Sequence, residues 1–269
     1  MPRGPSIKII SPLPMFFAKI SAKSNISVLL KETLSWASPA ALMDQGGAEY
    51  MNNYKRAKDV YYTAFSEVQL KYKGIDLYQD LLKHFRDWQI CASIDGTGKI
   101  GEWIRDGLDY NKWLDNFRRG CAISKHDRQM RLDLTITTPG LLDLKNMFRL
   151  SKQLNVEILT KVTFAFTPDI VLSPIALPRK LLNAIVDELL DFIEPLADSK
   201  QQSLVDVLNQ LKNRPVFEET WPDQYKKGWL DGKMKQERIG AIRRDYKKLT
   251  LEQIFSQDKR LLDWWDSIG

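Results

Sequence analysis

The sequence predicts an α/β protein made of successive βα units, with a parallel sheet and a helical C-terminal extension. Short apolar runs rich in β-branched residues alternate with longer segments in which apolar residues recur at helical spacing. From Pro178 onward only the helical spacing continues. The strands that can be identified are too few to close a barrel of eight strands, so the sheet is either a partial (β/α) barrel or an open parallel sheet.

The stretch at residues 89–98 organises the rest of the chain. Residues 89–94 form an apolar run without polar alternation, which is typical of a strand buried on both faces. Gly96 and Gly98 then turn the chain into a helical segment. Because parallel α/β proteins carry their chemistry at the carboxyl ends of the strands, Ser93 and Asp95 are the first candidate site residues.

Residues 1–70 carry the weakest pattern. Prolines interrupt the opening, and sequence rich in Ser, Ala and Lys follows. Within this region we expect a strand at residues 26–30 and a helix at residues 55–68. The pattern becomes clear after Gly74, where leucines recur at helical spacing and predict an amphipathic helix over residues 75–85.

The middle of the chain alternates between the two periodicities. Strands are predicted where β-branched residues gather or where apolar and polar residues alternate, and helices where apolar residues share one face. Pro178 stands at a favourable first-turn position of a helix. The predicted elements are, in order, helix 110–122, strand 131–137, helix 141–154, strand 156–166, helix 178–193 and helix 199–211.

Residues 216–269 are predicted to be helical and are rich in tryptophan. We expect these aromatic side chains to fold back over the sheet as core residues rather than to stack on a ligand: Trp221, Trp229, Trp264 and Trp265. The predicted organisation is a divergent N-terminal region (1–70), a partial βα barrel (71–195) and a helical C-terminal extension (196–269).

Composition sets limits on the class of protein and its partners. The 269 residues carry a formal net charge of +6, which is mildly basic. Basic residues are densest at 238–248, and this cluster is either a solvated helix face or a contact for an anion or nucleic acid. No nucleic-acid-binding signature accompanies it, which argues against nucleic acid as the partner.

The cysteine and histidine content excludes several kinds of site. The chain has two cysteines, Cys91 and Cys121, and two histidines, His84 and His126, so it offers neither a C-x-x-C motif nor a disulfide framework. We expect a reduced, cytoplasmic protein. The apolar patch at residues 13–20 is too short to span a bilayer, so no membrane contact is predicted.

Several short motifs follow one another in a recognisable order. Residues Ser93-Ile94-Asp95-Gly96 end a strand, Ile104-Arg105 follows, and Trp113 to Phe117 lies on the next helix. Over roughly residues 73–269 this order resembles the second half of the radical S-adenosylmethionine (SAM) enzymes, in particular their branch with a twitch domain.

The resemblance implies a fold, cofactors and site residues. It implies a partial (β/α) barrel, a [4Fe–4S] cluster with SAM, and a peptide or small-molecule substrate. By the same resemblance Ser93, Asp95 and Arg105 face the cofactor or substrate, and Thr137 lines the pocket from the end of the next strand.

The chain departs from this family at the cluster motif. The family holds its cluster with a C-x-x-x-C-x-x-C loop, and here no cysteine precedes Cys91. The segment 46–49, Gly-Gly-Ala-Glu, is either a remnant of the family's G-G-E-P segment or a chance match. We therefore expect no metal site, and a chain that does not bind the cluster or SAM by itself.

Each candidate site residue also has a structural interpretation. Asp95 could cap the turn, Ser93 could satisfy backbone groups, Arg105 could form a surface salt bridge and Thr137 could bond within its loop. The two cysteines are expected in structural positions, and the two histidines in solvated or capping positions. We identify no acid/base partner for three further carboxylates, Asp109, Asp115 and Asp133.

Two functions follow from these observations. The first is a C-terminal portion or degenerate homologue of a radical SAM enzyme, whose enzymatic status stays open. The second is a non-catalytic interaction protein, in which the α/β core is a scaffold and the basic helical tail binds an acidic partner or nucleic acid.

Overall fold

The computed structural model describes residues 61–66, 71–72, 75–82, 87–163, 167–243 and 249–269. All of them belong to one compact unit, Lys58–Gly269. Some sequence features lie outside the described residues, namely the expected strand at 26–30, the apolar patch at 13–20, the Gly-Gly-Ala-Glu segment at 46–49, His84 and residues 244–248 of the basic cluster.

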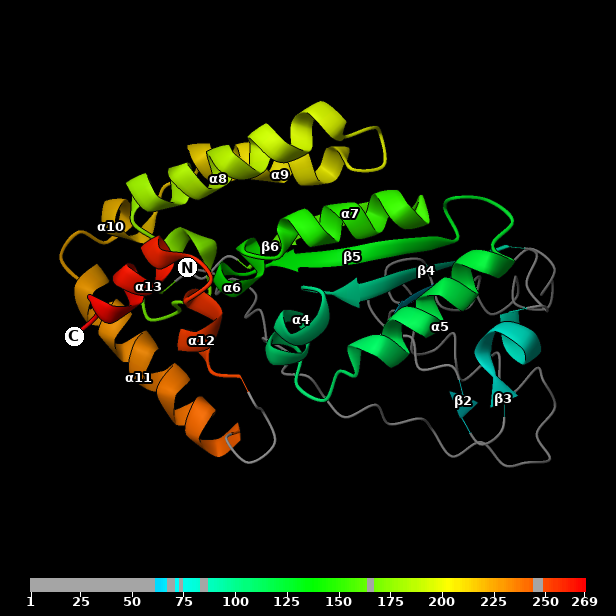
Figure 1. Ribbon diagram of the computed structural model, residues 1–269, viewed down its shortest axis with the longest axis horizontal. Coiled ribbons are helices and arrows are strands. Elements are labelled where there is room, and N and C mark those ends of the chain that lie inside the picture. Colours follow the sequence, from blue (N-terminus) through cyan, green and yellow to red (C-terminus); the bar gives the residue numbers. More distant parts are fainter. Residues whose placement is uncertain (1–60, 67–70, 73–74, 83–86, 164–166, 244–248) are drawn as a thin grey trace, which may run out of the picture. The chain divides into compact units, whose positions relative to one another are not determined.

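A parallel sheet of βα units forms the centre of the unit. Its four described strands follow the order β1-β4-β5-β6, and every neighbouring pair is parallel (Figure 1). The strands are β1 (Tyr61–Ser66), β4 (Asp87–Ile94), β5 (Met130–Ile136) and β6 (Glu157–Val162). The predicted α/β class and parallel sheet are therefore confirmed, as are the strands expected at 89–94 and 131–137 and the first part of 156–166.

The helix expected at residues 55–68 is wrong, because Tyr61–Ser66 forms strand β1. The sequence Tyr61-Tyr62-Thr63 has high strand propensity, and β1 pairs along its whole length with β4. Residues 75–85 are also less helical than expected. Among the described residues 75–82, Ile75–Asp76 is strand β3, paired with β2 (Lys71–Tyr72), and Leu77–Leu81 forms the short π-helix η2.

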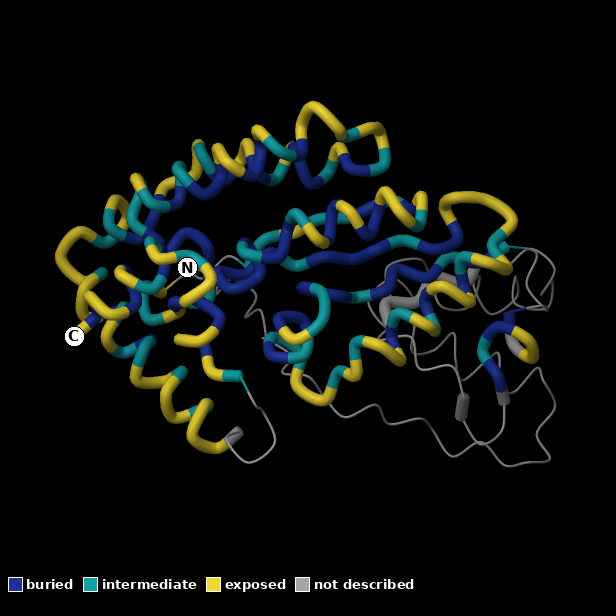
Figure 2. Tube along the Cα trace, viewed as in Figure 1, coloured by how far each residue is buried: buried dark blue, intermediate teal, exposed yellow. Residues whose placement is uncertain are grey.

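The two faces of the sheet differ in polarity. Successive side chains of a strand point to opposite faces. One face is largely buried and apolar, with Ile90, Ala92 and Ile94 on β4, Leu132, Leu134 and Ile136 on β5, and Ile158 on β6. Towards the end of β6 this face is only half-buried, at Thr160 and Val162. The other face carries Ser93, Arg131, Asp133 and Lys161, so β4 is apolar on one face only and not on both as expected. Figure 2 shows how strongly β4 and β5 are buried.

The helices between and after the strands follow the predicted order. They are α4 (Gly98–Ile104), α5 (Tyr110–Ile123), α6 (Thr138–Leu141), α7 (Leu144–Leu154), α8 (Arg179–Ile193) and α9 (Gln202–Asn213). The helix expected at 141–154 is split, because Leu142 ends α6 and Asp143 caps α7. Of these helices, α9 packs on β6 and α5 contacts β5.

The C-terminal extension is helical, as predicted. It contains α10 (Phe217–Thr220), α11 (Tyr225–Arg243), α12 (Leu251–Phe255) and α13 (Lys259–Asp266). Trp229 and Trp264 are perpendicular with ring centroids 5.9 Å apart, and Phe255 packs against both Trp264 and Trp265. The ring partners of these tryptophans are thus one another and nearby phenylalanine and tyrosine rings.

Beyond α9, which packs on β6, contacts with loops attach the rest of this extension to the sheet. The indole Nε1 of Trp229 donates a hydrogen bond of 2.7 Å to the Ala176 carbonyl, in the 3₁₀ turn η4 (Pro174–Ala176). Helix α12 contacts α6, which follows the carboxyl end of β5. The tail is therefore joined to the sheet through elements beyond the strand ends.

Candidate functional site

Asp95 lies where β4 ends, and its carboxylate connects three elements. Its Oδ1 accepts a hydrogen bond of 3.1 Å from the Thr135 N–H on β5. Arg105, the residue that ends α4, places its Nε 2.8 Å from Asp95 Oδ2. The Asp95 side chain is 9% exposed and that of Arg105 is 23% exposed. The structure thus brings these two predicted site residues together as a largely buried ion pair.

The turn after Asp95 depends on glycine. Gly98 has a φ of +48°, a conformation that side chains other than glycine rarely adopt. The first turn of α4 also presses against the preceding turn, since a Cβ on Gly101 would lie 2.1 Å from the Gly96 carbonyl oxygen. The predicted glycine turn is confirmed, and it lies between Asp95 and Arg105 in the sequence.

Asp143 is a residue that sequence reasoning missed. Its carboxylate is 3% exposed and accepts hydrogen bonds from the Thr97 N–H, from the Thr97 hydroxyl at 3.0 Å and from Asn146 Nδ2 at 2.7 Å. Burial raises the pKa of this carboxyl, while the hydrogen bonds act in the opposite direction. Asp143 ties the turn after β4 to the start of α7.

Thr137 follows β5 and caps α6. Its Oγ1 accepts a hydrogen bond of 3.1 Å from the Gly140 N–H. Thr138, next to it, donates its hydroxyl to the Val171 carbonyl at 3.0 Å. A Cβ on Gly140 would lie 3.0 Å from the Asp95 carbonyl oxygen, so the loops after β4 and β5 are in direct contact.

Ser93 faces a row of charged side chains on the polar face of the sheet. Its hydroxyl donates to Asp133 Oδ2 at 3.2 Å, and Lys161 Nζ lies 2.7 Å from the same oxygen. Arg131 pairs with Glu157 at 2.9 Å in the same region. Asp133, which the sequence presents as a single carboxylate, therefore has both a serine and a lysine as partners.

The two thiols are protected from ionisation. Cys91 is buried in β4 and Cys121 lies on α5, and both are free. Burial raises the pKa of both thiols, that of Cys121 to about 11. Among the residues that the structure describes, no three His, Cys, Asp or Glu side chains are grouped so that they could hold a metal ion.

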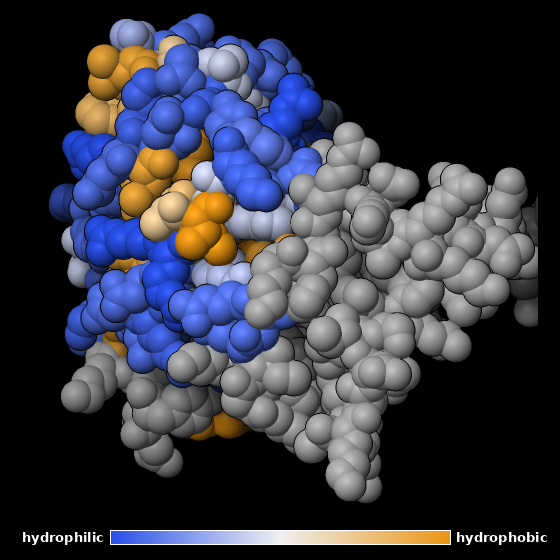
Figure 3. All heavy atoms as spheres, turned by 90° about the vertical axis from the view of Figure 1, so that its right-hand side faces the viewer, coloured by the Kyte–Doolittle hydropathy of each residue, from blue (hydrophilic) through white to orange (hydrophobic). Residues whose placement is uncertain are grey.

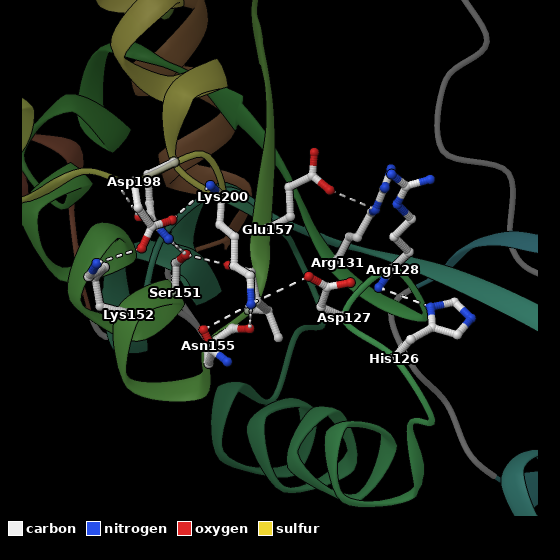
Figure 4. A network of polar contacts seen from close by, with 12 residues as sticks. His126, Asp127, Arg128, Arg131, Ser151, Lys152, Asn155, Glu157, Asp198 and Lys200 are labelled. Atoms are coloured by element: carbon white, nitrogen blue, oxygen red, sulfur yellow. Dashed lines mark hydrogen bonds and ion pairs between the residues drawn. The ribbon is translucent and has the colours of Figure 1, made fainter.

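A second polar cluster lies at the opposite, amino-terminal end of the strands (Figure 4). Lys200 Nζ donates to the carbonyl and the side-chain oxygen of Asn155 at 3.0 and 2.9 Å, and lies 3.6 Å from Asp127. Lys152 pairs with Asp198 at 2.8 Å. His126, expected in a capping or solvated position, lies 3.0 Å from the Asp87 carboxylate.

This second cluster joins loops and carries no arrangement for chemistry. Its members come from the turns before β5, before β6 and before α9, from the end of α7 and from the start of β4, so the interactions join neighbouring segments at this end of the sheet. Figure 3 shows that the described surface on this side is mainly hydrophilic, with isolated hydrophobic side chains. The cluster therefore holds the amino-terminal ends of the strands in register.

The chain matches no protein-family model, no curated protein and no solved structure. Within the described ranges, no helix combines the length and the apolar character needed to cross a bilayer.

Proposed function

We propose that this chain is a degenerate homologue or C-terminal portion of a radical SAM enzyme, and that by itself it is a scaffold without cluster chemistry. One observation carries the proposal: each of the four predicted site residues is bonded within the fold. Asp95 pairs with Arg105, Ser93 donates to Asp133 and Thr137 caps α6. These bonds hold loops and strands together. Thr137 bonds within its loop, as its structural interpretation expects. The other partners differ from the expected ones, because Asp95 accepts from the Thr135 N–H rather than capping the turn, and Ser93 bonds a side chain rather than the backbone.

The topology supports the same lineage. The four strands of the main sheet are parallel and lie side by side in the order in which the chain forms them, with the antiparallel pair β2–β3 inserted between β1 and β4. This order is that of successive units in a partial (β/α) barrel. The thiols support the lack of a cluster, since cluster ligation requires thiolates and burial raises the pKa of both Cys91 and Cys121. Two free thiols also agree with the expected reducing, cytoplasmic compartment.

Anaerobic reconstitution with iron and sulfide tests this proposal. We expect no absorbance band near about 400 nm and no heat of SAM binding from the chain alone. A brown protein whose band disappears in Cys91→Ser or Cys121→Ser would overturn the proposal. An upstream open reading frame that encodes a C-x-x-x-C-x-x-C segment would favour the C-terminal portion over the degenerate homologue.

The second candidate is an interaction protein whose basic helical tail binds an acidic partner. It is favoured by α11, which carries six basic and two acidic residues, with Lys226, Lys227, Lys235 and Arg238 all exposed. A surface of this charge attracts acidic chains in a salt-dependent way. We expect polyglutamate to bind at low ionic strength and to dissociate as salt is added. The absence of binding at low salt would exclude this candidate.

A further inference from the structure

Two glycines let one side of helix α11 pack closely against the rest of the protein. A Cβ on Gly228 would lie 2.5 Å from Pro168, and one on Gly232 would lie 2.5 Å from the Asp169 carbonyl oxygen. The backbone of the helix therefore rests directly on the segment after β6. Lys233 holds a neighbouring side, because its ammonium donates to the carbonyls of Trp265 and Ile268 at 2.9 Å each. The remaining surface of α11 faces away from these contacts.

That surface carries a regular row of exposed side chains. Five residues spaced four apart are all exposed, and basic and apolar types are interspersed along the row: Lys226, Leu230, Met234, Arg238 and Ile242. Residues at this spacing form a ridge on a helix. We call these five residues the outer row. Its apolar members Leu230, Met234 and Ile242 are 39%, 38% and 76% exposed. Leu230 also borders the C-terminal residue, since a Cβ on Gly269 would lie 2.6 Å from its Cδ1.

The cations of the outer row are available to a partner. Lys227 and Lys235, beside the row, pair with Asp231 and Asp169. Within the described part of the chain, neither Lys226 nor Arg238 takes part in an ion pair. They are twelve positions apart, which corresponds to about 18 Å along a helix and about a third of a turn around it, so they flank Leu230 and Met234 from two sides.

We propose that the outer row is the docking surface for an acidic amphipathic helix of a partner protein. The inference rests on the interaction function above and adds to it the site and the class of partner. Ridges at four-residue spacing pack into the grooves of a second helix. Leu230 and Met234 between the cations, and Ile242 beyond Arg238, gain free energy by burial against apolar side chains. The cations select carboxylates about 18 Å apart.

Other anionic partners fit this surface less well. Nucleic acid offers phosphates to the cations but little apolar surface for the residues between them. A membrane-lying helix needs a broad apolar face, whereas Asp231 and Glu237 lie beside the outer row. Duplex DNA and anionic vesicles are therefore comparison ligands in the test.

The test uses the full chain and a fluorescent synthetic helix. The probe is a peptide of about 20 residues with two glutamates twelve positions apart and leucines between them. Its comparison peptide has the same composition with the glutamates adjacent. We expect the first peptide to bind at least about tenfold more tightly than the second and than polyglutamate of equal charge.

Two variants locate the site on α11. Two double variants are each expected to weaken binding by about tenfold or more: Lys226→Glu with Arg238→Glu, and Met234→Ser with Ile242→Ser. Lys180→Glu and Leu196→Ser change an exposed lysine and an exposed leucine elsewhere and are expected to leave affinity unchanged. Far-UV circular dichroism checks that each variant is folded.

The outcomes separate this inference from the general interaction function. If polyglutamate binds as tightly as the spaced peptide and Met234→Ser with Ile242→Ser has no effect, the docking surface is refuted while the interaction function stands. If no acidic ligand binds at low salt, both fail. Equal or tighter binding of DNA or of phosphatidylserine vesicles through the same residues would also overturn the proposed partner class.

Discussion

Thr97 donates both its N–H and its hydroxyl to the buried carboxylate of Asp143, which lies 46 positions further along the chain. Together with Asn146, these donors compensate the carboxylate for the water that it loses on folding. The pair holds the loop after β4 against the start of α7. The arrangement that carries Asp95 and Arg105 therefore depends on a contact outside the predicted site residues.

The first prediction concerns Asp143. Replacement by alanine leaves the Thr97 donors without their partner, so Asp143→Ala should lower the free energy of unfolding by about 2–3 kcal/mol. Urea denaturation measures the loss. The matched control is Asp115→Ala, an exposed carboxylate on α5, which should change the free energy by less than about 0.5 kcal/mol. Equal effects of the two variants would contradict the role of Asp143.

The second prediction concerns Arg179, which joins α8, α9 and α10. Its guanidinium contacts both carboxylate oxygens of Glu219 and donates to the carbonyls of Lys212 and Arg214. A lysine cannot reproduce this planar set of donors. Arg179→Lys should therefore cost about 1–2 kcal/mol of unfolding free energy by urea denaturation. Lys180→Ala, at the neighbouring exposed position, should be nearly neutral, and a neutral Arg179→Lys would refute the interpretation.

The third prediction is a loss of stability in acid. Hydrogen bonds from Arg260 lower the pKa of Asp258, and those from Lys152 and Arg179 lower the pKa values of Asp198 and Glu219. A carboxyl whose folded pKa lies below its unfolded value stabilises the fold fully above the unfolded value. This stabilisation is lost as the pH falls through the folded pKa.

Asp143 contributes with the opposite sign, because its folded pKa is raised. Its contribution favours the folded state in acid and is lost as the pH rises through the folded value. Among the described residues, carboxyl groups with a lowered pKa outnumber Asp143, whose pKa is raised. Thermal stability should therefore fall on acidification from about pH 6 to about pH 3. In Asp258→Asn the decline should be shallower. An unchanged pH profile in that variant would contradict the assignment to Asp258.

The sequence predicted the elements with strong local patterns and failed where distant contacts decide. Strands β4, β5 and β6 and helix α5 have a clear periodicity of their own. Strand β1 was missed although Tyr61-Tyr62-Thr63 favours a strand locally, because its pairing with the distant strand β4 is not visible in the sequence. The partnership of Ser93 with Asp133 spans 40 positions and depends on strand register, which a single sequence does not contain.

For the candidate site, the sequence predicted the positions of the residues but not their partners. The sequence located Ser93, Asp95, Arg105 and Thr137 near strand ends, because polar residues there interrupt apolar runs. It did not reveal that Asp95 pairs with Arg105, since this pairing depends on the path of the turn and of α4 between them, where Gly101 packs closely on Gly96. Asp143 was missed because it falls inside a run whose helical periodicity continues across the break between α6 and α7.

The last prediction tests how α11 is seated, and the helix supplies its own control. An alanine at Gly232 would place its Cβ 2.5 Å from the Asp169 carbonyl oxygen, whereas at Gly240 the space is open. Both substitutions improve helix propensity, by about 0.5–1 kcal/mol. At Gly240 that gain should appear as a higher free energy of unfolding. At Gly232 the helix must shift away from Asp169, so the net change should be a loss of about 1–3 kcal/mol.

Urea denaturation of the two variants measures these opposite signs. The steric contact moves the helix itself. Trp229 lies three positions before Gly232 on the same helix, so Gly232→Ala should also weaken the hydrogen bond from Trp229 to Ala176. Tryptophan fluorescence should therefore change in Gly232→Ala and stay the same in Gly240→Ala. If both variants stabilise the protein equally, α11 does not rest on the segment after β6, and the outward direction of the outer row loses its basis.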